Sequence, residues 1–381
     1  MELTISKKDF LRGLTRTHGV ADRKSSMPML SNILISTTDT NHVRLAATDL
    51  YLGVSAVCSA KVKKGGAVAV SARHVFDIVK NLPEGDIEWK VGENHSVEIR
   101  SGKVRYQIRG MPGDDFPPLP APEEAGFSKL GADMIGSLIS LTHYSMSTDD
   151  TRPYLAGALF EGDGKIVRMV TTDGHRLSKA ESKLGSVGKG LVSFSMLVPN
   201  KGVMELRRLI DDIKSEKEKG KGDNGATIEI ATSGGSAFFR REGLQLSVKL
   251  SDEQFPPYAK VIPQTQGRRV IVPRFRLVEA LKRISLVAND RSGGVRLQLE
   301  PGLLRITSEN PDVGEGSEEL EVDYAGEPLV IGFNAKYLLD VLAALTEDSI
   351  ALEVNGELDP GVIKPASDQT DFIGVIMPMR I

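Results

Sequence analysis

The feature that most constrains this chain is a short pattern that recurs at the spacing of a small domain. Near the middle, residues 170–177 read VTTDGHRL; residues 45–52 (LAATDLYL) and, more weakly, residues 305–311 (RITSENP) resemble them. The copies lie about 130 residues apart, which is the size of a domain and far longer than a solenoid repeat. A chain of 381 residues therefore holds three such units.

Helical periodicity supports the same threefold division. Apolar residues three and four positions apart predict amphipathic helices over 71–82, 199–210 and 334–345. Aligning these helices makes the bases Arg73, Lys201 and Lys336 equivalent, and likewise the acids Asp77, Glu205 and Asp340. A second helix is predicted earlier in each unit, over 10–17, 134–143 and 275–287, and each leads to a strand, at 32–35, 157–160 and 294–297.

The remaining segments predict antiparallel sheet. Alternating apolar and polar residues, as in 86–91 and 96–100, are typical of half-buried strands. Proline pairs at 116–119 and 255–258 end the first two units. We predict an α+β fold with three domains, at 1–120, 128–255 and 256–381, each with two helices packed on antiparallel sheet. The charged stretch 214–225 predicts a solvated loop.

Composition indicates an ordinary soluble protein. Apolar residues make up 40% of the chain and charged residues 26%, and no apolar run approaches the roughly 18 residues of a membrane span. A single cysteine, Cys58, and a charged N-terminus predict a cytoplasmic protein. The net charge of −3 argues against a nucleic-acid partner unless basic residues gather on one surface.

The helices supply such a surface. Arg73, Lys201 and Lys336 lie near helix N-termini, where a cation opposes the helix dipole by about 0.3–1 kcal/mol. One shared anion would explain three equivalent cations; ordinary surface bases are the alternative. Helix faces rich in lysine and arginine on an acidic protein indicate contact with phosphates without reading of bases.

One segment of the first unit and one segment of the last unit carry opposite charge. Residues 100–109 hold bases and no acid, including Lys103 and Arg105, whereas residues 309–323 hold acids and no base, including Glu315, Glu318 and Glu319. Head-to-tail pairing of two chains would bring these segments together twice and close a ring. Two separately solvated faces are the alternative.

Signs of catalysis are sparse. Asp173 and His175 are two residues apart and would share one face of a strand, which suggests an acid–base pair. No nucleophile motif, metal-ligand cluster or phosphate-binding glycine loop accompanies them. We therefore predict no enzyme activity, no cofactor and no metal. The apolar C-terminal residues 375–379 suggest instead a groove for a short apolar peptide, with core packing as the alternative.

With the threefold repeat, TDGHRL at 172–177, GFN at 332–334 and MPMR at 377–380 in view, the whole chain resembles the bacterial DNA polymerase III beta subunits, the sliding clamps. The resemblance implies a non-catalytic head-to-tail homodimer, a six-domain ring whose helices line the central hole. It implies as partners double-stranded DNA, encircled without sequence preference, the DNA polymerase III catalytic subunit, the clamp loader and other proteins that carry a clamp-binding peptide.

The resemblance also implies site residues. The DNA-contacting positions are Lys24, Arg73, Asp149, Pro153 and Tyr154. Those of the peptide groove are Leu155, Thr172, Gly174, His175, Arg176, Leu177, Pro256, Lys260, Val261, Asn334, Tyr337, Val375, Ile376, Met377, Pro378, Met379 and Arg380. Those of the dimer interface, added to the charged residues above, are Tyr106, Ile108, Ile284 and Leu286.

Two of the DNA positions, Asp149 and Pro153, depart from the commoner family pattern. Lys24 keeps the charge of an arginine without its bidentate fork, Asp149 replaces a neutral amide, and Pro153 replaces an aromatic residue. These departures leave open a clamp paralogue that no longer serves replication, for instance one carried for resistance to a clamp-binding inhibitor. An enzyme that uses Asp173 and His175 is the other alternative.

Overall fold

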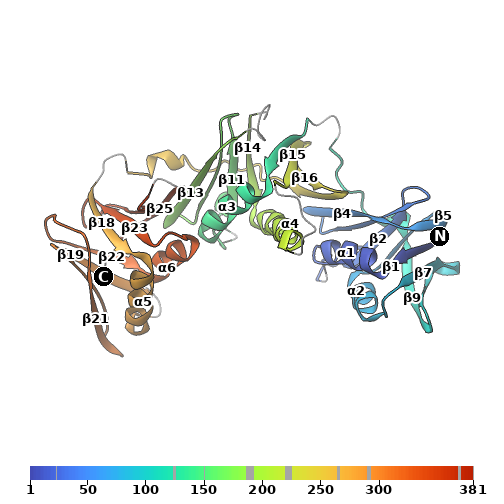
Figure 1. The fold of residues 1–381 in the computed structure, drawn as a ribbon, viewed down its shortest axis with the longest axis horizontal. Helices are drawn as coiled ribbons and strands as arrows, with labels where there is room; N and C mark the ends of the chain where they lie inside the picture. The colour runs from blue at the N-terminus through green and yellow to red at the C-terminus, as the bar shows by residue number, and fades with distance from the viewer. Residues whose placement is uncertain are drawn as a thin grey trace. The chain divides into compact units, whose positions relative to one another are not determined.

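The computed structural model (Figure 1) describes residues 1–22, 24–122, 126–149, 151–185, 193–218, 225–263, 267–289, 293–367 and 370–380. The chain divides into two compact units. Unit 1 combines residues 1–132 with residues 204–250, and unit 2 combines residues 133–203 with residues 251–381. Each unit therefore contains parts of two consecutive repeats. Within the described ranges, no helix is both long and apolar enough to cross a membrane.

The predicted helices are confirmed, two per repeat. They are α1 (Lys7–Thr17), α2 (Ala72–Asn81), α3 (Ala132–Thr142), α4 (Asn200–Glu218), α5 (Arg274–Ile284) and α6 (Ala335–Ala344). Side chains cap three of them, because Ser6, Ser71 and Asn334 each accept a backbone N–H of the first turn. The loop predicted over 214–225 is wrong at its start, since α4 continues through Glu218; residues 219–224 lie outside the described part.

Unit 1 is built on one continuous antiparallel sheet. Its strand order is β10-β15-β16-β17-β4-β3-β2-β6-β9-β8-β7-β1-β5. The bounds are β1 (Glu2–Ser6), β2 (Asn32–Thr37), β3 (His42–Thr48), β4 (Leu52–Ser59), β5 (Lys61–Lys64), β6 (Ala67–Ser71), β7 (Asp86–Val91), β8 (Ser96–Ser101), β9 (Val104–Pro112), β10 (Ser128–Gly131), β15 (Thr227–Ser233), β16 (Ser236–Arg241) and β17 (Leu244–Lys249). Helices α1 and α2 lie side by side against it (Figure 1).

Unit 2 contains two sheets, ordered β14-β11-β12-β13-β25-β24-β23-β18 and β21-β20-β19-β22. The bounds are β11 (Gly157–Gly162), β12 (Ile166–Thr172), β13 (Arg176–Lys183), β14 (Phe194–Pro199), β18 (Arg268–Pro273), β19 (Gly294–Glu300), β20 (Leu303–Asn310), β21 (Gly314–Glu321), β22 (Leu329–Asn334), β23 (Ser349–Val354), β24 (Gly361–Pro365) and β25 (Asp371–Ile376). Helices α5 and α6 pack on each other and against these strands (Figure 1).

Two strand pairs join consecutive repeats. In unit 1, β4 of the first repeat pairs with β17 of the second, with Leu52 opposite Val248. In unit 2, β13 of the second repeat pairs with β25 of the third, with Leu177 opposite Val375. The two pairs are equivalent in the repeat, since β4 and β13 each follow the recurrent turn. Neighbouring repeats thus share a sheet, which explains why the compact units cut across them.

Candidate functional site

The recurrent turn of the second repeat is held by its own side chains. The Asp173 carboxylate accepts the backbone N–H groups of His175 (2.9 Å) and Arg176 (3.0 Å). The Thr172 hydroxyl accepts the Gly174 N–H and donates to the Arg176 carbonyl. Gly174 has φ +90°, a region that disfavours side chains. The predicted turn is confirmed, but the expectation that Asp173 and His175 share a strand face is wrong, because β12 ends at Thr172 and β13 begins at Arg176.

Arg176 anchors this turn to the third repeat. Its buried guanidinium donates to Asp173 (3.0 Å), to Asp340 on α6 (2.6 Å) and to the Tyr144 carbonyl (2.6 Å). The same group lies over the rings of Tyr337 (4.5 Å) and Tyr144 (5.5 Å). Two carboxylates and a carbonyl compensate the buried charge, and the flat guanidinium suits stacking between rings.

Two tyrosines complete the anchor. Burial raises the pKa of Tyr144 above its usual range, although its hydroxyl bonds with Ser178 (2.9 Å) and Arg176 lies nearby. Burial also raises the pKa of Tyr337, and the Asp173 carboxylate adds to the shift. The His175 ring stacks on Tyr337 at 6.5 Å between centroids. Both tyrosines are therefore neutral over the physiological pH range.

The C-terminal segment is held between the turn and the third repeat. The Met377 N–H donates to the His175 carbonyl (2.9 Å), and the Met379 N–H donates to the Gly332 carbonyl on β22 (2.9 Å). Val375 and Ile376 are buried, whereas Met377 is 40% exposed and Arg380 is exposed. The segment thus presents the exposed Met377 and the half-buried Met379 on a backbone fixed by hydrogen bonds.

An apolar cluster lies beneath this segment. Leu177 and Val375 pack with Val170 and Val362, and the partly buried Phe255 and Tyr258 lie against them. Leu155 is buried at the end of the 3-10 helix Pro153–Leu155. The core alternative therefore holds for Leu155, Leu177, Val375 and Ile376, while exposed side chains border the cluster at His175, Lys260, Val261, Met377 and Arg380. Pro256, Tyr337 and Asn334 are half-buried. We call these residues together the junction site.

Two strand edges stand out from the paired ones. Strands β4, β17, β13 and β25 are mostly buried where they pair. By contrast, residues 104–107 of β9 are exposed, and β21 is exposed at five of its eight residues. Among the described residues, positions 104–109 of β9 pair only with β8, and β21 pairs only with β20. One edge of each strand is therefore open.

Charged and apolar side chains flank both edges. Arg105 donates to Glu98 (2.9 Å), a neighbour on β8 that the one-signed sequence pattern did not reveal. Glu318 pairs with Arg283 (2.6 Å) and Glu319 with Arg305 (2.8 Å), so part of the acidic charge is neutralised within the chain. Leu286 is 80% exposed and Tyr106 is 40% exposed, whereas Ile108 is half-buried and Ile284 is buried. Lys103 and Glu315 are exposed.

Comparison with known proteins gives a consistent result. The family models of the DNA polymerase III beta subunit match residues 1–120 (N-terminal domain), 129–257 (central domain) and 259–380 (C-terminal domain). Together they account for nearly the whole sequence.

The chain belongs to the beta sliding clamp family.

Individual relatives agree in sequence and structure. The chain is 33% identical to the beta sliding clamp of Escherichia coli and 31% identical to that of Vibrio cholerae, in both cases over the full length of both proteins. The structure matches the DNA polymerase III subunit beta of Pseudomonas aeruginosa with a TM-score of 0.92 at 30% identity, covering both chains completely. It matches a sliding clamp of Bartonella birtlesii bound to griselimycin with a TM-score of 0.90 at 33% identity, again over both full lengths.

The DNA-contacting residues expected for this clamp fall into two groups. Lys24 and Arg73 belong to unit 1 and are exposed. Lys24 lies in a turn, where its N–H donates to Asp22 (2.9 Å), and Arg73 lies in the first turn of α2, 3.7 Å from Asp77. Arg73, Lys201 and Lys336 each occupy the second position of their helices and are exposed. A single anion shared by these three cations stays a prediction.

The second group, Asp149, Pro153 and Tyr154, lies in unit 2. Asp149 accepts the Thr151 hydroxyl (2.6 Å), the Thr151 N–H (3.0 Å) and the Arg152 guanidinium (2.9 Å). These hydrogen bonds hold the pKa of the Asp149 carboxyl below its usual range. The acid therefore has a local role, as it organises the bend that leads to Pro153 and Tyr154 at the edge of the junction site.

Sequence reasoning missed two contributors to the junction site. Tyr144 follows α3 without any pattern that marks it, yet its ring and carbonyl both contact Arg176. Asp340 was marked only as the equivalent of Glu205 in the aligned helices, and the structure gives it the Arg176 ion pair. The equivalence of Asp340 and Glu205 was the one signal in the sequence for this ion pair. An acid on a helix that packs against a neighbouring repeat needs a cation as its partner.

Proposed function

We propose that this clamp is the processivity factor of a DNA polymerase, a non-catalytic head-to-tail homodimer that closes a six-domain ring around double-stranded DNA in the cytoplasm. The repeats that make the ring run over residues 1–120, 128–255 and 256–381. The ring tethers the DNA polymerase III catalytic subunit, and it is opened and closed by a clamp loader. Membership of the beta sliding clamp family supports this function.

The strand edges carry the dimer part of the proposal. Within the chain, the strand after the recurrent turn pairs with the last strand of the next repeat, once as β4 with β17 and once as β13 with β25. The third repeat offers β21 in the first role, and the first repeat offers β9 in the second, each with an open edge. Pairing β21 of one chain with β9 of another repeats the same junction, and doing so twice closes a ring.

The charged side chains favour pairing of β9 with β21 over pairing of either strand with its own copy. The β9 edge carries Arg105, with Lys103 in the turn just before it, and the β21 edge carries Glu315, Glu318 and Glu319. Opposite charges meet when β9 faces β21, whereas like charges meet when either edge faces its own copy. The exposed Tyr106 and Leu286 would be covered in the same contact.

The DNA contact is electrostatic and loose. Lys24, Arg73 and Tyr154 face phosphates, and Asp149 and Pro153 shape the bend next to Tyr154. Non-specific binding by a few phosphate contacts reaches only about 10⁻⁴–10⁻⁶ M at physiological salt. Such binding is too weak to hold a polymerase for long, so residence on DNA comes from closure of the ring.

The junction site is the proposed docking place for partner peptides. It offers methionine side chains on a fixed backbone, an apolar cluster below them, and exposed polar side chains at His175 and Arg380. Methionine-rich apolar surfaces adapt to several partner sequences. A family member binds griselimycin, which supports ligand binding by clamps of this fold.

The test is primer extension by DNA polymerase III on a primed circle with its clamp loader. Addition of this clamp should lengthen the DNA that the polymerase makes in a single binding event. A variant that ends before Met377 should not lengthen these products but should still have the mass of a dimer. Full stimulation by the truncated variant would refute docking at the junction site. Unchanged product length with the intact clamp would refute the processivity function itself.

A further inference from the structure

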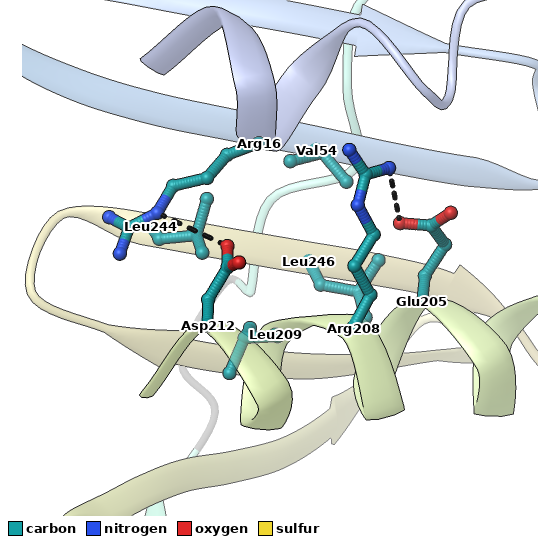
Figure 2. Close-up of a pocket in the computed structure, with 8 residues that line it drawn as sticks. All are labelled: Arg16, Val54, Glu205, Arg208, Leu209, Asp212, Leu244 and Leu246. Carbon is teal, nitrogen blue, oxygen red and sulfur yellow. Dashed lines mark ion pairs between the residues drawn. The ribbon is translucent and has the colours of Figure 1, made fainter. Parts of the chain in front are cut away.

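A narrow cleft in unit 1 separates α1 of the first repeat from α4 of the second (Figure 2). Figure 2 shows Arg16 paired with Asp212 across the cleft and Arg208 paired with Glu205, with apolar side chains between them. The lining residues are Arg16, Val54, Glu205, Arg208, Leu209, Asp212, Leu244 and Leu246. The cavity volume is about 20 Å³, which is room for about one water molecule. The cleft is therefore too small for a ligand. Its charged side chains instead form ion pairs with each other and contact the two helices.

Arg208 reaches across this cleft from α4 to the end of α1. Its Nη2 donates to the Thr15 carbonyl in the last turn of α1. Its Nη1 lies 3.6 Å from the Glu205 carboxylate of its own helix (Figure 2). The last carbonyls of a helix have no partner within the helix and carry partial negative charge. A guanidinium satisfies one of them and compensates that charge.

The same guanidinium lies against Gly19, the second residue beyond the helix. A Cβ atom at Gly19 would lie 2.1 Å from Arg208 Nη1 and 3.1 Å from its Cζ. Only glycine fits under the arginine without displacing it. The chain then continues through Val20 and Ala21, both buried, to Asp22, whose side chain accepts the Lys24 N–H.

The second junction makes the same connection with a different arginine. There Arg176 donates to the Tyr144 carbonyl beyond α3 and to Asp340 on α6. Asp340 is equivalent to Glu205, and Tyr144 follows His143 as Gly19 follows His18; both histidines bond through Nδ1 to the carbonyl four residues earlier. In each junction an arginine therefore links the end of one repeat's first helix to the acid on the next repeat's second helix.

We propose that Arg208 is a positioning residue for DNA contact: by fixing the end of α1 and Gly19, it sets the place from which Lys24 meets a phosphate. The second repeat thereby determines the DNA-facing geometry of the first. This inference rests on the DNA contact proposed above for Lys24.

The test is a double-mutant cycle on binding of a short duplex of mixed sequence, measured across a range of salt concentrations. Lys24→Ala should weaken binding and reduce the salt slope by about 0.9, the value for one phosphate contact. Arg208→Lys keeps the charge but cannot span Thr15 and Glu205, so it should weaken binding about as much as Arg208→Ala. Both Arg208 changes should add nothing to Lys24→Ala. Arg207→Lys, one residue earlier on α4, is the matched control and should bind as the parent does.

Three outcomes would overturn the inference. If Arg208→Lys binds the duplex as the parent does, the charge of residue 208 alone matters. If an Arg208 change weakens binding equally in the parent and in Lys24→Ala, Arg208 acts independently of Lys24. Hydrogen exchange supplies a readout that does not depend on DNA: amides 19–22 should exchange faster in Arg208→Lys, and unchanged protection would refute positioning. If Lys24→Ala binds the duplex as the parent does, the proposed DNA contact of Lys24 is refuted. The hydrogen-exchange measurement still tests whether Arg208 holds residues 19–22 in place.

Discussion

Replacing Arg176 is the sharpest perturbation of the junction site. Arg176→Ala removes three hydrogen bonds, to Asp173, Asp340 and the Tyr144 carbonyl, and contacts with two tyrosine rings. Removing one partner of a buried ion pair costs about 3–5 kcal/mol. The Asp340 side chain is 30% exposed and can be rehydrated once the arginine is gone. We therefore expect a loss near the lower end of that range, about 3 kcal/mol in the stability of unit 2.

Urea unfolding read out by hydrogen exchange measures this loss locally, because a chain with two compact units need not unfold in one step. Arg176→Lys should lose less, since a lysine retains one ion pair but neither the fork nor the stacking. Arg152→Ala is the matched control: its half-exposed pair with Asp149 should contribute less than about 1 kcal/mol. A loss below about 1 kcal/mol for Arg176→Ala would refute the view that this side chain joins the second and third repeats.

Three further changes test other parts of the molecule. Replacing Glu318 and Glu319 together by lysine should weaken the dimer at least about tenfold in sedimentation, because like charges then meet at the β21 edge; an unchanged dimer would count against that interface. Gly174→Ala should cost about 1–2 kcal/mol in urea unfolding, since the residue has φ +90° and a Cβ would lie 3.1 Å from Arg152; parental stability would contradict the strain. Burial raises the pKa of Glu205 above its usual 4.5, with Arg208 opposing and Asp49 and Asp212 adding to the shift. The contribution of Glu205 to folding stability is therefore present at low pH and is lost as the pH rises through its folded-state pKa. Glu205→Gln should gain stability over the parent at pH 7 and lose that advantage below pH 4.5, and the opposite trend would refute the sign.

Periodicity was enough to predict the helices and many strands. The apolar spacing in residues 71–82 and 334–345 depends only on which helix face is buried, so it predicted α2 and α6 to within about a residue at each end. The turn at Asp173 and Gly174 was also predictable, because its hydrogen bonds are local and its positive φ favours glycine. Local physics of this kind is visible in a single sequence.

Pairing between repeats was not visible in the same way. Nothing in the spacing of Leu52 or Leu177 indicates that β4 meets β17 or that β13 meets β25, because strand partners are chosen by the folded sheet. The buried anchor was missed for the same reason: Arg176 reads as one more turn residue until Tyr144 and Asp340 surround it. The loop expected from the charge of residues 214–218 was wrong because lysine and glutamate are good helix formers, and α4 simply continues through them.

Retention on DNA tests the ring most directly. The clamp should be loaded onto a nicked circular duplex, separated from free protein, and followed after the circle is cut once. A closed ring should appear as a particle of twice the mass of one chain that stays on the circle at moderate salt. It should leave within the time needed to slide off once the DNA has ends. Equal dissociation from circular and linear duplex, or a single chain retained on the circle, would contradict the closed ring.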